Sequence, residues 1–186
     1  MLNDTLIAAY MHLLQQLNAS NTLSSTLIMQ PSFMFKLKGN EDVRRFTSTR
    51  RNQVNINDYT RILISIHHED KVHYTFVSIL LPEKIIDYHE PIAGYTNPTR
   101  FVSLNLLWLS EEQKRWPDVH FDLAEWRWRV VESFPRQTNG WDCGVFMLAG
   151  MESIVRGKQS FEFSQSDMNT IRRKMARSII DQKIEL

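Results

Sequence analysis

The sequence predicts an α+β fold, because helical patterns stand at its two ends and strand patterns lie between them. Residues 59–67 and 72–81 are rich in β-branched and aromatic residues and are joined by a short charged turn, as two central strands would be. The run 143–157 is strongly apolar and ends at a glycine, which indicates a buried helix. With 186 residues, 42% of them hydrophobic, we expect one domain over residues 1–186.

The N-terminal part of the chain predicts one helix and one short strand. Asn3 or Asp4 can cap a helix over about residues 4–17, in which apolar side chains recur on one face at helical spacing. Residues 26–30 then read TLIMQ, which indicates a short strand that ends at Pro31. A polar loop separates the two elements.

The elements that follow the two central strands are predicted from the same patterns. Residues 83–90 continue the sheet as the third strand of a meander, and residues 128–134 indicate another strand. An amphipathic helix is expected over residues 99–115. A last helix follows Ser164, whose spacing to Asp167 resembles a capping box.

The composition excludes several classes of protein. The formal net charge of +1 provides no bulk field for nucleic acid. Cys143 is the only cysteine, which excludes an internal disulfide framework and a multi-cysteine zinc site and favours a reducing compartment. Residues 5–35 contain no charged side chain, but polar residues interrupt them, so no apolar stretch of about 18 residues predicts a membrane span.

The segment 135–146, PRQTNGWDCGVF, carries the strongest chemical signal. A lone cysteine is most often a small buried hydrophobic residue. Here Gly140 and Gly144 flank the cysteine, and the apolar helix begins at Cys143 itself. The dipole and free N–H groups of a helix N-terminus stabilise a thiolate, so Cys143 is a candidate nucleophile. Gln137 can donate an amide N–H to the oxyanion of a tetrahedral intermediate.

A cysteine nucleophile works with a base and a group that orients the base. His73, at the start of a predicted strand, is a candidate base, but the chain contains six histidines. Asp87 and Glu90 lie on or just after the next strand, and either carboxylate can orient His73 if the strands pair as a meander. These patterns alone leave open which histidine and which carboxylate act.

Several segments resemble the Ulp/SENP family of proteases that act on SUMO and NEDD8. QTNGWDCGVF resembles the nucleophile segment of that family, and RILISIHHEDKVHYTFVSILL resembles its two strands around the catalytic histidine. MLNDTLIAAYMHLL, VRRFT and FSQSDMNTIRRKMARSII resemble further family segments, so the similarity spans nearly the whole chain. The resemblance implies a papain-like α+β fold of the Ulp and adenain type, with a central mixed or antiparallel sheet flanked by helices.

The resemblance also implies roles for the candidate residues. His73 takes the place of the base, Cys143 that of the nucleophile, and Gln137 that of the oxyanion-hole side chain. For the acid, the family has an Asp-Ser pair after an Ile-x-Tyr-x run, and Glu90 occupies the place of that aspartate. We prefer Glu90 to Asp87, because the two residues fall on opposite faces of a strand.

By resemblance, the substrate is the C-terminal Gly-Gly tail of a ubiquitin-like modifier. SUMO is the first expectation, with NEDD8 and ubiquitin as alternatives. The family places tail contacts at Asp4, Arg45, His67 and Tyr74. Tyr74 and Met1 replace the two tryptophans that roof a narrow tunnel in the family, so the sequence leaves the identity of the modifier open.

We expect a monomer that needs no metal or other cofactor, binds neither nucleic acid nor a membrane, and acts in the nucleus or cytoplasm or as an effector in a host cell. Two other functions stay open. Bacterial acyltransferases that use acetyl-CoA share the order His–Glu–Cys, which Glu90 fits, although the sequence around Cys143 favours the protease. A non-catalytic module that binds a ubiquitin-like protein is supported only by the replaced tryptophans.

Overall fold

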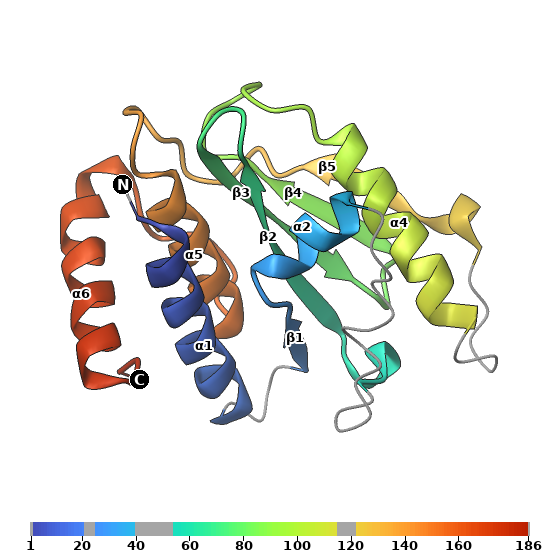
Figure 1. Cartoon of the computed structure of the whole chain (residues 1–186), viewed down its shortest axis with the longest axis horizontal. Helices are drawn as coiled ribbons and strands as arrows, with labels where there is room; N and C mark the ends of the chain where they lie inside the picture. The colour runs from blue at the N-terminus through green and yellow to red at the C-terminus, as the bar shows by residue number, and fades with distance from the viewer. Residues whose placement is uncertain (1, 21–24, 40–53, 115–121, 186) are drawn as a thin grey trace.

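A computed structural model of the chain describes residues 2–20, 25–39, 54–114 and 122–185. These residues form a five-stranded sheet with helices packed on both of its faces (Figure 1). The strands lie side by side in the order in which they occur in the sequence. This is the α+β arrangement that the sequence predicts.

The centre of the sheet is an antiparallel meander of β2 (Arg61–His68), β3 (His73–Leu80) and β4 (Ile85–His89). The two short edge strands, β1 (Thr26–Ile28) and β5 (Arg127–Val130), pair in parallel with β2 and β4, so the sheet is mixed. The predicted meander is therefore confirmed. The last strand is shorter than predicted, because the chain turns after β5.

Three helices cover one face of the sheet and lie together at one end of the molecule in Figure 1. They are α1 (Asp4–Ser20), α5 (Cys143–Val155) and α6 (Met168–Asp181). Twelve of the thirteen residues of α5 are buried, as expected for a helix between the sheet and two other helices. Phe76 and Leu63 contribute to this core from the sheet.

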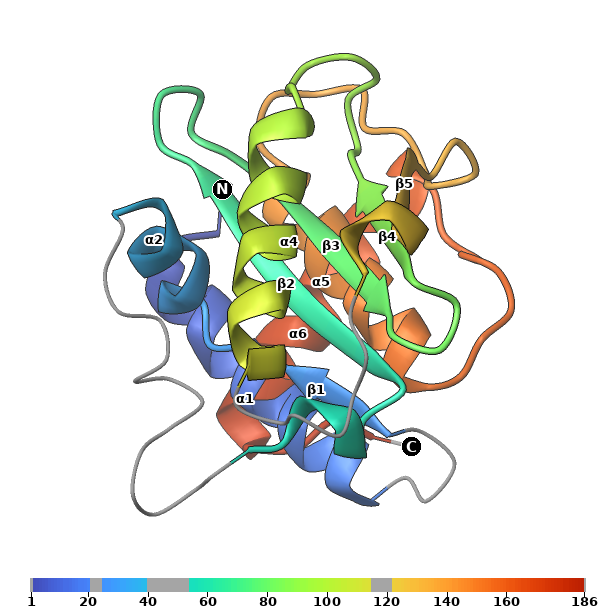
Figure 2. The same ribbon diagram turned by 90° about the vertical axis from the view of Figure 1, so that its right-hand side faces the viewer.

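The other face is covered by α2 (Ser32–Lys38) and α4 (Thr99–Lys114). In Figure 2, α4 lies in front of the sheet and α2 lies to its left. Alternation along β2 sends Ile62 and Ile64 into this second core and Leu63 into the first. Because the sheet is buried on both faces, its central strands read as nearly continuous apolar runs.

The helix α2 was not predicted. Its start follows Pro31, a residue whose fixed φ suits the first turn of a helix as well as the end of a strand. Phe33, Met34 and Leu37 are buried at helical spacing, which is the signal that could have revealed it. The predicted helix at the N-terminus is confirmed and extends three residues further, to Ser20.

The C-terminal helix starts as predicted. Ser164 and Asp167 form the capping box, and a 3-10 turn (Gln165–Asp167) leads into α6. Gly157 ends the preceding helix segment with a φ of 70°, the left-handed conformation that favours glycine. No helix in the described part of the chain is long and apolar enough to cross a membrane.

Candidate active site

Cys143 is the first residue of α5, and its side chain is buried with 1% of its surface exposed. The helix starts tightly, since the backbone oxygen of Asp142 accepts hydrogen bonds from the N–H groups of Val145 and Phe146. The sulfur therefore lies at the positive end of a helix of 13 residues. This is the placement that the sequence predicts for the candidate nucleophile.

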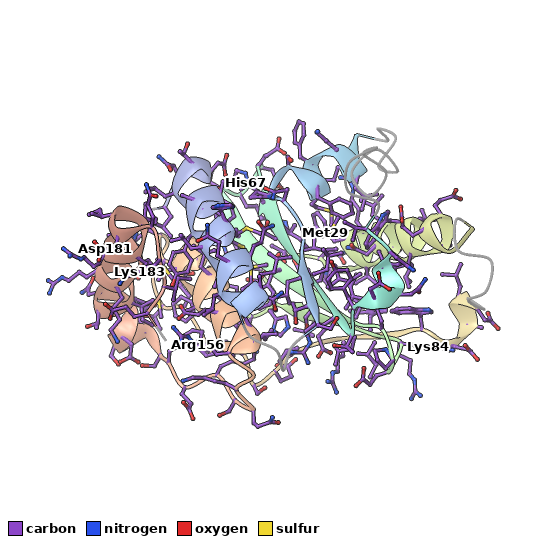
Figure 3. The ribbon with its side chains drawn as sticks, turned by 90° about the horizontal axis from the view of Figure 1, so that it is seen from below. Met29, His67, Lys84, Arg156, Asp181 and Lys183 are labelled. Atoms are coloured by element: carbon purple, nitrogen blue, oxygen red, sulfur yellow. The ribbon has the colours of Figure 1, made fainter. Side chains whose placement is uncertain are left out.

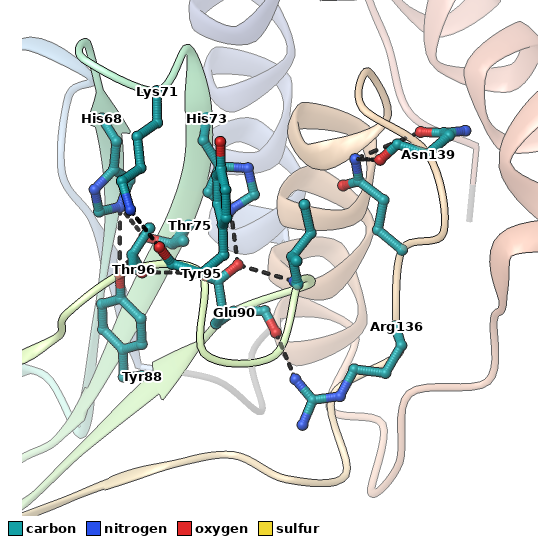
Figure 4. A network of polar contacts seen from close by, with 12 residues as sticks. His68, Lys71, His73, Thr75, Tyr88, Glu90, Tyr95, Thr96, Arg136 and Asn139 are labelled. Atoms are coloured by element: carbon teal, nitrogen blue, oxygen red, sulfur yellow. Dashed lines mark hydrogen bonds and ion pairs between the residues drawn. The ribbon is translucent and has the colours of Figure 1, made fainter.

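His73 and Glu90 form a buried pair at the end of the meander (Figure 4). The Nε2 atom of His73 lies 2.7 Å from Oε1 of Glu90, and both side chains are 3% exposed. Since Nε2 is held by the carboxylate, Nδ1 is the ring nitrogen left for the Cys143 thiol. The structure thus places the predicted base beside the predicted acid.

The electrostatics of this pair favour an imidazolium at neutral pH. Burial by itself would lower the pKa of His73, but hydrogen bonds with Cys143 and Glu90 outweigh it and raise that pKa to about 9. Burial would raise the pKa of Glu90, but bonds from His73, Thr96 and the Ile92 N–H hold it below its usual value. His73 therefore contacts both Glu90 and Cys143, the arrangement that a cysteine nucleophile and its base require.

Asp87, the other carboxylate considered from the sequence, is engaged elsewhere. It accepts two hydrogen bonds from the guanidinium of Arg129 on β5, the shorter at 2.7 Å. The structure therefore brings Glu90, and not Asp87, to His73. The preference for Glu90 came from its place in the family pattern, and strand alternation put Asp87 on the opposite face. The register of β4 with β5 explains the partner of Asp87.

The other described histidines have different surroundings. His68 is hydrogen-bonded to Thr75, and burial lowers its pKa to about 4. His89 is stacked on Phe76, with ring centroids 4.1 Å apart. Among the histidines that the structure describes, His73 is the one with a carboxylate at hydrogen-bond distance.

The loop before Cys143 is organised by Asn139, which the sequence analysis did not single out. Its Oδ1 accepts hydrogen bonds from the N–H groups of Trp141 and Asp142, both at 3.1 Å. Its Nδ2 donates to a carboxylate oxygen of Asp142 at 2.7 Å. Gln165, from the start of the C-terminal helix, also donates to Asp142, at 2.9 Å. The Asn-Gly pair at 139–140, a common turn signal, could have indicated this turn.

Gln137 lies in the segment that precedes Cys143, and this segment contacts Glu90 and Pro91. Its N–H donates to the Pro91 oxygen at 2.8 Å, and Arg136 donates to the Glu90 oxygen at 2.9 Å. The Gln137 side-chain nitrogen donates to the Asn139 backbone oxygen and lies 3.4 Å from the Asn139 Oδ1, so Asn139 orients this amide within the loop. The Oε1 atom of Gln137 is buried with no partner among the described residues, so a bound substrate could supply one.

Three of the four expected tail contacts lie together beside the nucleophile. The Tyr74 hydroxyl donates to Asp4, and the rings of Tyr74 and His67 are stacked with centroids 4.4 Å apart. A Cβ atom on Gly144 would lie 3.7 Å from the Tyr74 ring, so this cluster is next to the start of α5. Arg45 lies outside the described residues.

A cavity of about 550 Å³ lies away from this triad, between α1, α5, α6 and the C-terminal residues. Figure 3 shows Arg156, Asp181 and Lys183 at this end of the molecule, far from Lys84. Arg156 is paired with Glu152 at 2.8 Å. None of the residues that line the cavity belongs to the triad.

The sequence and the fold can be compared with known proteins. The family profile of the "Ulp1 protease family, C-terminal catalytic domain" matches residues 1–184. The chain belongs to the Ulp1 protease family. The resemblance seen in the nucleophile segment is thereby confirmed over almost the whole chain.

Curated relatives of this family are longer than the chain. Sentrin-specific protease 2 of Homo sapiens is 31% identical over 187 residues, which cover 98% of this chain and 30% of that protein. Ubiquitin-like-specific protease 1A of Arabidopsis thaliana is 28% identical over 195 residues, which cover 99% of this chain and 37% of that protein. The chain thus spans about a third of the length of these relatives.

Solved structures confirm the papain-like Ulp fold. One is the C-terminal Ulp1 protease domain in complex with Smt3, the yeast ortholog of SUMO, which matches with a TM-score of 0.79 and 22% sequence identity. The match covers 99% of this chain and 78% of the Ulp1 chain. Another is the Xanthomonas campestris effector protein XopD bound to ubiquitin, with a TM-score of 0.63 and 13% sequence identity. That match covers 95% of this chain and 90% of the XopD chain. At these identities the likeness concerns the fold.

Proposed function

We propose that this chain is a cysteine protease domain that cleaves after the C-terminal Gly-Gly of a ubiquitin-like modifier, with SUMO as the modifier. The observation that carries the proposal is the buried pair of His73 and Glu90, 2.7 Å apart, beside a cysteine at a helix N-terminus. Membership of the Ulp1 protease family supports it. The scissile bond is either a peptide bond in a precursor or an isopeptide bond to a lysine.

The proposed reaction begins with a thiolate at Cys143 and an imidazolium at His73. The thiolate attacks the carbonyl carbon of the terminal glycine, and the carbonyl oxygen becomes an oxyanion. The side-chain amide of Gln137 and the backbone N–H of Cys143 donate to that oxyanion; N–H groups in the first turn of a helix have no partner within the helix. His73 then gives its proton to the amine that leaves.

Hydrolysis of the thioester completes the cycle. His73 is now neutral and accepts a proton from water, and the resulting hydroxide attacks the thioester carbon. Collapse of the second tetrahedral intermediate releases the modifier with a free carboxylate and restores Cys143. Glu90 keeps the His73 ring oriented and stabilises its charge throughout. The residues named supply every group that this sequence of steps uses.

SUMO is preferred because the curated relatives include sentrin-specific proteases and a solved structure of the same fold holds Smt3, the yeast ortholog of SUMO. Ubiquitin is the main alternative, because XopD, of the same fold, was solved bound to ubiquitin. The cluster of Asp4, His67 and Tyr74, adjacent to the start of α5, is proposed to contact the tail. A reducing compartment such as the nucleus or cytoplasm suits a thiolate nucleophile.

The decisive experiment is covalent labelling with SUMO, NEDD8 and ubiquitin, each ending in a C-terminal electrophile. Cys143 is the only cysteine of the chain, so an adduct reports on this residue alone. We expect an adduct with SUMO on the wild type and none on Cys143→Ala. Labelling by another modifier instead would keep the protease proposal and change the substrate.

The absence of an adduct with all three modifiers on folded protein would overturn the protease proposal. Incubation with labelled acetyl-CoA and a protein substrate then tests the acyltransferase, whose activity Cys143→Ala would also abolish. Binding of an unmodified ubiquitin-like protein by both the wild type and Cys143→Ala, with neither activity, would instead indicate a binding module.

The proposed contact of the Tyr74 ring with the tail of the modifier can be tested separately. Tyr74→Trp restores the residue type of the family and is expected to keep labelling by the preferred modifier. Tyr74→Ala removes the aromatic ring and its stacking on His67. It is expected to slow labelling at least tenfold, a loss typical of a buried aromatic contact. Equal rates for the two variants would argue against a tail contact at Tyr74.

A further inference from the structure

Two groups besides His73 bind the carboxylate of Glu90. Its Oε1 atom accepts hydrogen bonds from His73 and from the N–H of Ile92, at 2.7 and 2.9 Å. Its other oxygen, Oε2, accepts from the hydroxyl of Thr96 at 2.5 Å. Glu90 is 2% exposed, so these protein groups take the place of water around the charge.

Thr96 also belongs to a partly buried chain of hydrogen bonds, drawn in Figure 4. Its hydroxyl lies 2.7 Å from the hydroxyl of Tyr88, which lies 3.0 Å from that of Thr75. The Thr75 hydroxyl in turn lies 2.9 Å from Nε2 of His68. The chain therefore runs from β2 through β3 and β4 to the loop after β4, and it ends on Glu90.

The ionised carboxylate sets the direction of the bonds. A carboxylate only accepts, so Thr96 donates to Glu90, and the single hydroxyl hydrogen of Tyr88 is free to donate to Thr96. The oxygen of Tyr88 then accepts from Thr75, and Thr75 accepts from the Nε2–H of His68. This is the arrangement in which every link is made, and donors aligned in one direction strengthen one another.

We propose that Thr96 is a positioning residue for the reaction: its hydroxyl, oriented by Tyr88, holds the Glu90 carboxylate in plane against His73. This inference rests on the proposed function. A glutamate has one more rotatable bond than the aspartate that the family has at this place, so its carboxylate needs more anchors. The Ile92 N–H fixes Oε1 and Thr96 fixes Oε2, and two anchors on two oxygens define the plane of the group.

The other members of the chain keep their protons at neutral pH. Burial raises the pKa of Tyr88 to about 12, so the phenol remains a donor. Burial and the nearby His73 lower the pKa of His68 to about 4, so this ring is neutral and adds no second cation beside the imidazolium of His73. The arrangement of donors is therefore unchanged over the working pH range of a cysteine protease.

The test compares Thr96→Val with Thr96→Ser and with Thr99→Val. Valine keeps the shape of threonine and removes the hydroxyl, serine keeps the hydroxyl, and Thr99, exposed at the start of α4, is the matched control. The rate of hydrolysis is followed with a fluorogenic amide of the modifier that labels the wild type, from pH 6 to pH 10. Thermal unfolding of each variant reports on its folded fraction.

For Thr96→Val we expect kcat to fall about ten- to a hundredfold, as for a lost hydrogen bond to a charged group, with KM unchanged. The alkaline limb of the pH profile should move to lower pH, because a displaced Glu90 no longer supports the imidazolium of His73. Thr96→Ser and Thr99→Val should behave as the wild type, and Tyr88→Phe should shift the limb in the same direction by less.

Over the pH range in which thermal unfolding shows both proteins to be folded, an alkaline limb in Thr96→Val that coincides with that of the wild type would overturn the inference, whatever the fall in rate. If the wild type cleaves none of the modifiers, the proposed function fails separately. An NMR titration of His73 in the wild type and in Thr96→Val then tests the inference without activity: equal midpoints overturn it, and a lower midpoint in the variant supports it.

Discussion

The guanidinium of Arg172, in α6, binds the carboxylate of Asp142, the residue that immediately precedes Cys143. Asp142 is 5% exposed and also accepts from Asn139 and Gln165. Burial would raise the pKa of Asp142, but these three partners hold it below its usual range. The last helix of the chain therefore anchors the start of α5, and with it the position of the candidate nucleophile.

Arg172→Met is expected to lower kcat about tenfold and the free energy of unfolding by roughly 1–3 kcal/mol, because a buried carboxylate loses a charged donor. Arg173→Met is the matched control, since Arg173 is the exposed neighbour on the same helix. Urea unfolding and hydrolysis of a fluorogenic modifier amide measure the two effects. Equal behaviour of the two variants would show that the contact with Asp142 has no role in placing Cys143.

Glu90→Gln is expected to lower kcat/KM by about a hundredfold or more, because the neutral amide no longer stabilises the His73 imidazolium. Asp87→Asn is the control: it loses its charged contact with Arg129, which lowers stability because Asp87 is buried, but Asp87 does not contact His73, so the activity of the folded protein should change little. Hydrolysis assays on both variants decide between the two carboxylates. A larger loss in Asp87→Asn would reverse the assignment.

The pH dependence of the same variant follows from the sign of the His73 shift. Because the pKa of His73 is raised to about 9 in the folded protein, its contribution to stability is complete below about pH 6.5 and is lost as the pH rises through 9. The alkaline limb of activity is expected near pH 9 in the wild type and lower in Glu90→Gln. Urea unfolding at pH 6.5 and 9 should show a smaller loss of stability in the variant.

Most of the fold could be predicted because its elements carry strong periodic patterns. The two central strands and α5 are long and apolar, and their burial on both faces leaves few alternatives. The helix α2 was missed because it has only seven residues, and its first signal, Pro31, also ends strands. Short elements that depend on tertiary packing leave little periodicity in the sequence.

The site could be predicted less completely than the fold. Cys143 carried a local signal in its glycines and helix start, but the partnership of His73 with Glu90 depends on strand register, which the sequence only suggested. Thr96 and Arg172 could not be found, since a threonine in a loop and an arginine on an amphipathic helix look like ordinary surface residues. Their roles follow only from the buried carboxylates that they contact.

Gly150→Ala is expected to destabilise the protein. A Cβ atom at this position would lie 2.7 Å from the Phe134 ring and 3.0 Å from the Phe76 ring, inside the core under α5. Overpacking of this kind costs about 1–3 kcal/mol, which exceeds or cancels the gain of about 1 kcal/mol from alanine in a helix.

Gly144→Ala is the matched control on the same helix. Its Cβ would meet Ile7 at 3.4 Å, an ordinary contact, so the helix gain should remain. Urea unfolding of both variants gives the comparison, with stability and not activity as the measure, because Gly144 is adjacent to Cys143. A Gly150→Ala variant at least as stable as Gly144→Ala would show that the two rings move aside without cost.

His89 is expected to make the protein less stable in acid. Burial, helped by Arg61 and Arg129, lowers its pKa to about 3, and its ring is stacked on Phe76. Below about pH 6.5 the unfolded chain takes up a proton that the folded protein refuses until about pH 3. This one group should therefore remove about 1.4 kcal/mol of unfolding free energy per pH unit in that window.

Between pH 7 and pH 5 the loss from His89 amounts to about 2 kcal/mol. His89→Gln lowers stability at pH 7, because it gives up the ring stack, but its further loss on going to pH 5 should be smaller than that of the wild type by this amount. The pKa of His68 is lowered as well, but His68 is present in both proteins. The difference between their pH dependences therefore reports on His89 alone. His12→Gln, on the exposed face of α1, removes a histidine outside the core and is the matched control. If the free energy of unfolding of His89→Gln has the same pH dependence as that of the wild type, His89 titrates alike in the folded and unfolded states. Its burial would then not be the cause of acid sensitivity.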